Sequence, residues 1–206
     1  WNRAAPWRVP VVGAAAGGHV QVDGRRYPMA QHGFARDLPF AVIDRSEEAV
    51  SLSLGDDAAT RAHYPFPFRL IIEARIGPKT LTFTIRVENP GETPLPYALG
   101  FQPFAGGERR AGGGYAVLFE EAERPFVPEV GAGGLLVRSE RALPLDGRRL
   151  DLDPELFTEA LVFLNARSRA MRFVAPSGRA IAMRMEDFPH LAVWTKPTAP
   201  FLSLEA

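Results

Sequence analysis

Hydrophobic and polar residues alternate along several stretches of the chain, most clearly between residues 68 and 88. From Phe68 to Ile76 every second residue is apolar, and after the turn residues Gly77–Thr80 the alternation resumes from Leu81 to Val87. Successive side chains of a β-strand point to opposite faces of its sheet. This stretch therefore predicts a β-hairpin with one apolar face.

The same pattern recurs near the C-terminus, where residues 171–173 and 181–185 alternate on either side of the turn Pro176–Gly178. Shorter strand candidates, separated by glycine and proline clusters, are His19–Val22, Phe40–Ile43, Val50–Leu54, Tyr115–Phe119, Leu135–Arg138, Leu161–Leu164, Leu191–Trp194 and Phe201–Leu204. Helical periodicity is confined to a short turn at Asp153–Phe157. Many short strands with almost no helix predict an all-β fold, an antiparallel β-sandwich or barrel of two stacked sheets.

The composition of the chain bears on its partners, its location and its number of domains. The chain has 206 residues, 24 basic and 24 acidic residues and no cysteine. A zero formal charge gives no reason to expect nucleic acid or an anionic membrane as partner. No apolar run is long enough for a spanning helix, and we expect a soluble, cytoplasmic protein. No repeat or change in composition divides the chain, which predicts a single domain over residues 1–206. Because residue 1 is Trp1, we expect that an N-terminal segment precedes it.

Several common kinds of site are disfavoured by the sequence. The glycine-rich stretches lack the Gly-Lys-Ser/Thr ending of a phosphate-binding loop. The histidines His19, His32, His63 and His190 show no metal-ligand spacing, so we expect no metal site. No serine stands in a Gly-x-Ser-x-Gly elbow, so the sequence gives no support for a serine hydrolase.

Two short motifs carry candidate site residues. In the first, His32 precedes Gly33 and lies four residues before Arg36, so an imidazole and a guanidinium could face an oxygen-rich ligand. A structural histidine is an equally good interpretation of this spacing. In the second, Gln102 lies between Phe101 and Phe104 and must find hydrogen-bond partners if it is buried. A strand-end glutamine is more often structural than functional.

The C-terminal segment offers an aromatic side chain and a carboxylate. Trp194 could present a flat apolar face to a sugar ring. Glu205 ends an apolar strand, where a carboxylate is either solvated or a candidate general base. Because it is the second-last residue, Glu205 is expected to fray unless more chain follows.

Together three segments resemble signature motifs of one family. HGFAR (residues 32–36), GFQPF (residues 100–104) and WTKPTAPFLSLE (residues 194–205) resemble, in this order, motifs of the aldose 1-epimerase (galactose mutarotase) family, in particular its bacterial branch. The resemblance implies a large β-sandwich, often called a supersandwich, with a shallow sugar-binding cleft on one sheet. It also implies that the opening and final strands of the family fold are missing from the chain.

The resemblance implies an enzyme that interconverts sugar anomers by opening the ring, a reaction of proton transfers that needs no cofactor. By motif, Glu205 matches the family base and His32 a histidine that hydrogen-bonds the sugar near its ring oxygen. Gln102 stands where the family has its acid histidine, and a carboxamide cannot transfer a proton near neutral pH. Arg36 and, by a looser match, Glu159 are implied to bind sugar hydroxyls, as Trp194 would through its ring.

Three outcomes are compatible with glutamine at position 102. His32 could serve as the acid, Gln102 could polarise the ring oxygen in a slow enzyme, or the protein could bind sugar without catalysis. A free aldohexose such as galactose or glucose is the expected ligand. The alternatives are a carbohydrate-binding protein on the same fold and a hexose-6-phosphate mutarotase, whose motif also contains an HG-x-AR element.

Overall fold

The computed structural model describes residues 7–106, 114–196 and 201–206. The chain forms two compact units, Trp7–Leu99 and, within the described residues, a second that begins at Gly100 and ends at Ala206. Nearly all regular structure is antiparallel β-sheet, as the alternation predicts. In the described residues, no helix is long and apolar enough to cross a membrane.

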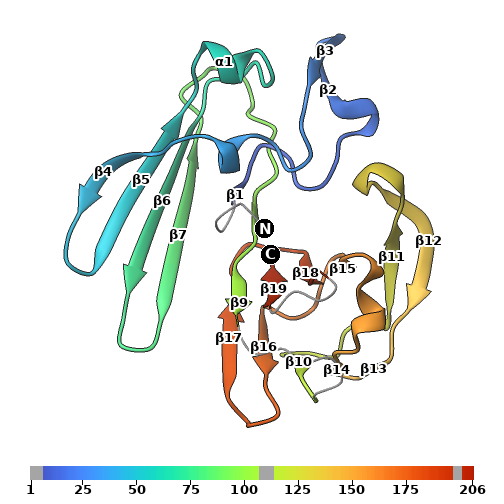
Figure 1. Cartoon of the computed structure of the whole chain (residues 1–206). Helices are drawn as coiled ribbons and strands as arrows, with labels where there is room; N and C mark the ends of the chain where they lie inside the picture. Colours follow the sequence, from blue (N-terminus) through green and yellow to red (C-terminus); the bar gives the residue numbers. More distant parts are fainter. Residues whose placement is uncertain (1–6, 107–113, 197–200) are drawn as a thin grey trace. The chain divides into compact units, whose positions relative to one another are not determined.

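The unit of residues 7–99 is built on a four-stranded antiparallel meander in the order β4-β5-β6-β7 (Figure 1). A smaller hairpin, β2-β3, precedes the meander. The strands are β1 (Trp7–Arg8), β2 (His19–Val22), β3 (Arg25–Pro28), β4 (Ala41–Arg45), β5 (Ala49–Gly55), β6 (Arg69–Ile76) and β7 (Leu81–Glu88), and the helices are η1 (Ala16–Gly18), η2 (Ala35–Asp37) and α1 (Ala58–Arg61).

The β6–β7 hairpin is confirmed, and its register pairs the apolar residues of one face, Leu70 with Val87 and Ile72 with Ile85. Its apolar face is buried at one end only. Leu70 and Ile72 are 0% and 1% exposed, whereas Ile76 and Leu81 at the turn are 63% and 58% exposed. The alternation therefore predicts the face of each residue correctly but not its depth.

The second unit contains a five-stranded sheet in the order β13-β14-β10-β16-β17 and a four-stranded sheet in the order β15-β18-β19-β9. A further hairpin, β11-β12, lies between β10 and β13 in the chain. The elements are β8 (Gly100–Phe101), β9 (Phe104–Gly106), β10 (Ala116–Phe119), β11 (Phe126–Val130), η3 (Ala132–Gly134), β12 (Leu136–Ala142), β13 (Leu145–Asp146), β14 (Arg149–Asp151), η4 (Pro154–Thr158), β15 (Leu161–Phe163), β16 (Ala170–Val174), β17 (Ala180–Arg184), β18 (Leu191–Trp194) and β19 (Phe201–Glu205).

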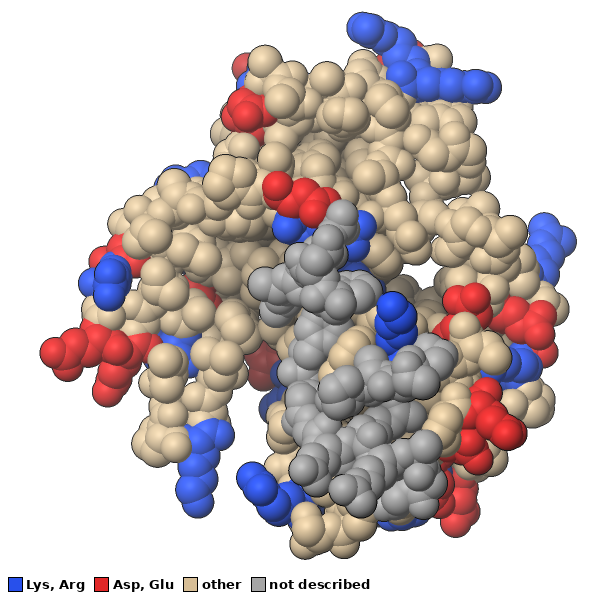
Figure 2. Space-filling view, viewed as in Figure 1, with Lys and Arg blue, Asp and Glu red and all other residues tan. Residues whose placement is uncertain are grey.

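Each unit has a hydrophobic core of its own. In the second unit, inward side chains of the two sheets, among them Val117, Met171, Val193 and Leu202, are fully buried. In the first unit the core is smaller and surrounds Leu70 and Ile72. Lysine, arginine, aspartate and glutamate are interspersed over the described part of the surface in Figure 2, in keeping with a formal charge of zero.

Candidate functional site

Gln102 and Glu205 lie 103 positions apart in the chain and meet inside the second unit. Nε2 of Gln102 donates a hydrogen bond of 2.6 Å to Oε1 of Glu205. Both side chains are buried, with 4% and 3% of their surface exposed. A carboxylate oxygen can only accept, so the amide nitrogen of Gln102 faces it. The sequence predicted both residues as candidates but not this contact.

Backbone pairing fixes the two segments against each other on both sides of this contact. Phe101 and Ala206 exchange two backbone hydrogen bonds, of 2.7 and 3.0 Å. Further along, Ser203 of β19 pairs with Phe104 of β9. The buried hydroxyl of Ser203 also donates to the carbonyl of Pro103 at 3.0 Å. The register that results places Gln102 opposite Glu205.

Glu205 is the last residue of a strand that is paired on both edges. On its other side, β19 pairs with β18, where Ala192 lies opposite Glu205. Leu202 and Leu204 are buried, as the sequence predicted. The expectation that Glu205 frays is therefore wrong, because pairing at Ala206 and burial of the strand hold the carboxylate in place.

His32 lies in the other unit, in a loop closed by two hydrogen bonds to Gly13. The backbone amide of His32 donates to the carbonyl of Gly13 at 2.7 Å, and the amide of Gly13 donates to Nδ1 of His32 at 3.0 Å. An amide N–H must meet a lone pair, so Nδ1 carries no proton. In this arrangement the neutral ring has its proton on Nε2 and can act there as a donor.

Gly33 is required by a backbone contact. Its φ is +70°, and a Cβ built on it would lie 2.0 Å from the carbonyl oxygen of Val9. That oxygen accepts hydrogen bonds from the amides of Phe34 and Ala35, at 3.0 and 3.3 Å. The group that requires glycine here is therefore the backbone of Val9, a part of the chain itself.

Arg36, on η2, is fixed within the same segment. Nη2 donates to the carbonyl of Gln31 at 2.7 Å, and Nε lies 3.6 Å from a carboxylate oxygen of Asp37. The side chain of Arg36 is only 11% exposed. These contacts orient the guanidinium by anchoring it on the loop that also carries His32.

The remaining predicted residues, Trp194 and Glu159, lie in the second unit with Glu205. Trp194 ends β18 and is half-buried, with its ring centroid 5.6 Å from that of Phe201. Glu159 follows η4, is exposed, and has no hydrogen bond or ion pair with the described residues. Residues 197–200, which lie between Trp194 and Phe201 in the chain, are outside the described residues.

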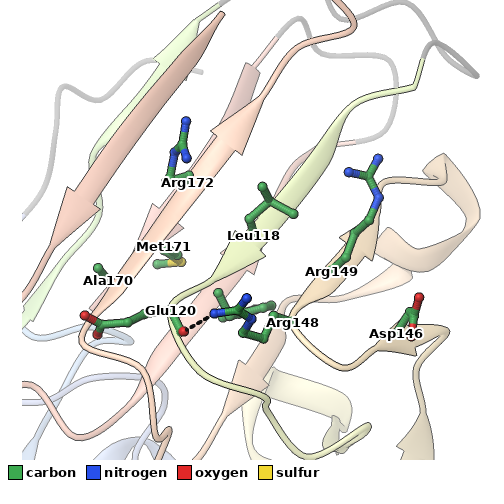
Figure 3. Close-up of a pocket in the computed structure, with 9 residues that line it drawn as sticks. Leu118, Glu120, Asp146, Arg148, Arg149, Ala170, Met171 and Arg172 are labelled. Atoms are coloured by element: carbon green, nitrogen blue, oxygen red, sulfur yellow. Dashed lines mark hydrogen bonds between the residues drawn. The ribbon is translucent and has the colours of Figure 1, made fainter. Parts of the chain in front are cut away.

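A hollow on the outer face of the five-stranded sheet is separate from these residues. Leu118, Arg149 and Arg172 occupy paired positions on three neighbouring strands and point to the same side (Figure 3). Arg149 forms a 2.7 Å ion pair with Asp151, and Nη1 of Arg148 donates to the carbonyl of Glu120 at 3.1 Å. None of the predicted site residues lines this hollow.

A second hollow, within the unit of residues 7–99, borders the His32–Arg36 segment. Its lining includes Gly33, Phe34 and Asp37, together with His63, whose Nδ1 lies 2.8 Å from the carbonyl of Pro28. Among the described residues no cluster of acidic, histidine or cysteine side chains could hold a metal ion. The hollow is thus lined by backbone, apolar carbon, an imidazole and a carboxylate.

Comparison with known proteins relates these features to one family. Residues 3–104 match the family model described as aldose 1-epimerase. Over its whole length the chain is 27% identical to the plasmid-encoded protein LacX of Lactococcus lactis and covers 73% of it. It also matches a galactose mutarotase-like protein from Lactobacillus casei, with 28% identity, a TM-score of 0.92 and coverage of all of this chain and 73% of that one. A galactose mutarotase-related enzyme from Lactobacillus acidophilus shares the fold, with 21% identity, a TM-score of 0.87 and coverage of all of this chain and 71% of that one.

Proposed function

Because this chain belongs to the aldose 1-epimerase family and is an isomerase of that type, we propose that it interconverts the α and β anomers of a free aldohexose such as galactose or glucose. The observation that carries the proposal is the buried carboxylate of Glu205, held at the end of a central strand by the amide of Gln102. A general base must have a fixed position relative to the proton that it removes, and this carboxylate has one.

The proposed reaction begins when Glu205 takes the proton of the C1 hydroxyl. As the C1–O1 bond becomes a carbonyl, the C1–O5 bond breaks and O5 acquires a proton. Rotation about C1–C2 and closure on the other face of the carbonyl give the second anomer, with the proton movements reversed. Positioned acid–base groups contribute about 10²- to 10⁴-fold each to such a step. Proton transfers of this kind need no organic cofactor.

His32 has a hydrogen-bonding role in this proposal. Its Nδ1 accepts from the Gly13 amide, which fixes the orientation of the ring, and a proton on Nε2 would suit it to donate to a sugar oxygen. Accepting a proton at Nδ1 would break that hydrogen bond, which disfavours His32 as the acid. We assign the proton on O5 to a water molecule, and the hydroxide that remains is neutralised by the proton that Glu205 took from O1.

Arg36, Trp194 and Glu159 complete the proposal as sugar-binding residues. The oriented guanidinium of Arg36 can donate to hydroxyl oxygens. The ring of Trp194 can cover the C–H face of the sugar. Glu159, which is exposed and has no partner among the described residues, can accept from a hydroxyl.

The test is magnetisation-exchange NMR between the α and β anomeric protons of galactose and glucose, with catalytic amounts of protein. We expect faster exchange with the wild type and a 10²- to 10⁴-fold lower catalysed rate in Glu205→Gln, which keeps the shape but not the basicity of the side chain. Glu186→Gln, the same change at an exposed position, is the matched control. Equal rates for Glu205→Gln and wild type would refute Glu205 as the base.

A second candidate function is carbohydrate binding without catalysis, and the observation that favours it is Gln102. Glutamine supplies no transferable proton where the family has a histidine. Line broadening of the sugar signals without faster exchange would support this candidate over the enzyme. Tighter binding of galactose 6-phosphate than of galactose would instead favour a phosphorylated substrate.

A further inference from the structure

We infer that Gln102 is a positioning residue for Glu205 and does not act on the sugar ring. The inference rests on the proposed function, in which Glu205 is the base. The direct observation is the 2.6 Å hydrogen bond from Nε2 of Gln102 to Oε1 of Glu205, between two side chains that are both at least 96% buried.

In this geometry the amide of Gln102 restrains the orientation of the Glu205 carboxylate. A hydrogen bond from a neutral donor to a carboxylate is stronger than one between neutral groups, and burial removes the water that would compete for it. With Oε1 held by Gln102, the carboxylate cannot rotate freely, and Oε2 keeps a constant direction. Because an amide does not titrate, this restraint is the same across the working pH range.

The strand pairing shows that the contact is built into the fold. Gln102 is held between the Phe101–Ala206 backbone pair and the Ser203–Phe104 pair, so its backbone has little freedom to turn the side chain elsewhere. Ser203 adds a hydrogen bond to Pro103, the residue that follows Gln102. Gln102, which stands where the family has its acid histidine, is therefore placed to orient the base Glu205.

The experiment compares Gln102→Leu, which keeps the volume but loses the donor, with Ser203→Ala, which removes a different buried hydrogen bond between the same two segments. We expect Gln102→Leu to lower kcat about tenfold to hundredfold with KM changed less than about twofold. Ser203→Ala should lower kcat less than Gln102→Leu does, because it leaves the donor to Glu205 in place.

Any of three kinetic results would overturn the inference. If Gln102→Leu raises KM and leaves kcat unchanged, then Gln102 contacts the sugar and the proposed function stands. If kcat and KM both equal those of the wild type, Gln102 has no part in catalysis. If the wild type itself does not accelerate anomer exchange although it binds sugar, the proposed function and the inference fail together.

The side-chain amide of Gln102 gives a readout that is independent of activity. In wild-type protein, the amide proton bound to the carboxylate should resonate downfield of ordinary glutamine side-chain protons, and Glu205→Leu should abolish that shift. An unshifted resonance in the wild type would contradict the hydrogen bond itself. A shifted resonance combined with an unchanged Gln102→Leu rate would show a structural contact without a catalytic role, which also overturns the inference.

Discussion

At the scale of single residues, the loop around His32 is held in an uncommon backbone conformation. His32 and Gly33 both have positive φ, 67° and 70°, and only glycine takes up this region without steric cost. The reciprocal hydrogen bonds between His32 and Gly13 offset the cost at His32. Strain of this kind is retained in proteins where the surrounding contacts determine the conformation.

Replacing Gly33 with alanine should therefore be far more harmful than the same change at Gly24. Both have positive φ, but a Cβ at Gly24 meets nothing within 4 Å, whereas at Gly33 it meets the Val9 carbonyl at 2.0 Å. We expect a loss of about 1 kcal/mol in the free energy of unfolding for Gly24→Ala and of about 3 kcal/mol or more for Gly33→Ala. Urea denaturation measures both, and equal losses would show that Val9 can move away.

Tyr64 gives the protein a predictable loss of stability at high pH. Burial, together with neighbouring Tyr97, raises the pKa of Tyr64 to about 12. In the unfolded chain a tyrosine ionises near pH 10. Stability from this group is thus fully present below about pH 10 and is lost as the pH rises toward 12.

The corresponding experiment is urea denaturation at pH 8 and pH 11 for wild type and Tyr64→Phe. We expect the wild type to lose about 1 kcal/mol more than the variant between these two pH values, because phenylalanine cannot ionise. The variant also lacks the 2.8 Å hydrogen bond from the Tyr64 hydroxyl to the Pro96 carbonyl, which lowers its stability at both pH values equally. An identical pH dependence in the two proteins would contradict the assignment.

At the scale of elements, the apolar face of the meander β4–β7 is buried at one end and exposed to solvent at the other. Ile72 and Ile76 lie on the same face of β6, yet they are 1% and 63% exposed. Ile72→Ala should cost about 2–5 kcal/mol of unfolding free energy, and Ile76→Ala less than about 1 kcal/mol. Urea denaturation of the two variants tests this, and a large loss at Ile76 would mean that the end of the sheet is covered in solution.

Alternation predicts best the long strands β6 and β7, in which it extends over eight residues each. Strand β3 was missed because Arg25 and Arg26 break the apolar pattern, although Asp23-Gly24 is a strong signal for a tight hairpin turn. Strands β8 and β9 were also missed, because each is two or three residues long and is defined by its partner rather than by its own sequence. Local patterns cannot predict an element that exists only through distant pairing.

At the scale of the whole molecule, the same limit applies to the candidate site. The motifs identified His32, Gln102 and Glu205 as residues of interest, but spacing could not predict which pairs make contact. The structure joins Gln102 to Glu205 in one unit and His32 to Gly13 in the other. The prediction of one domain over residues 1–206 stays a prediction, as do the roles of Arg36, Glu159 and Trp194.

The pairing of β9 with β19 has a consequence for how the protein acquires activity. These strands close a loop of about a hundred residues, and long-range closures of this kind form slowly because their entropy cost precedes the gain from contacts. Glu205 meets Gln102 only once this closure has occurred. After dilution from denaturant, the proposed anomer exchange should therefore return at the rate of the slowest folding phase. The return of activity would then measure the rate of the last folding step.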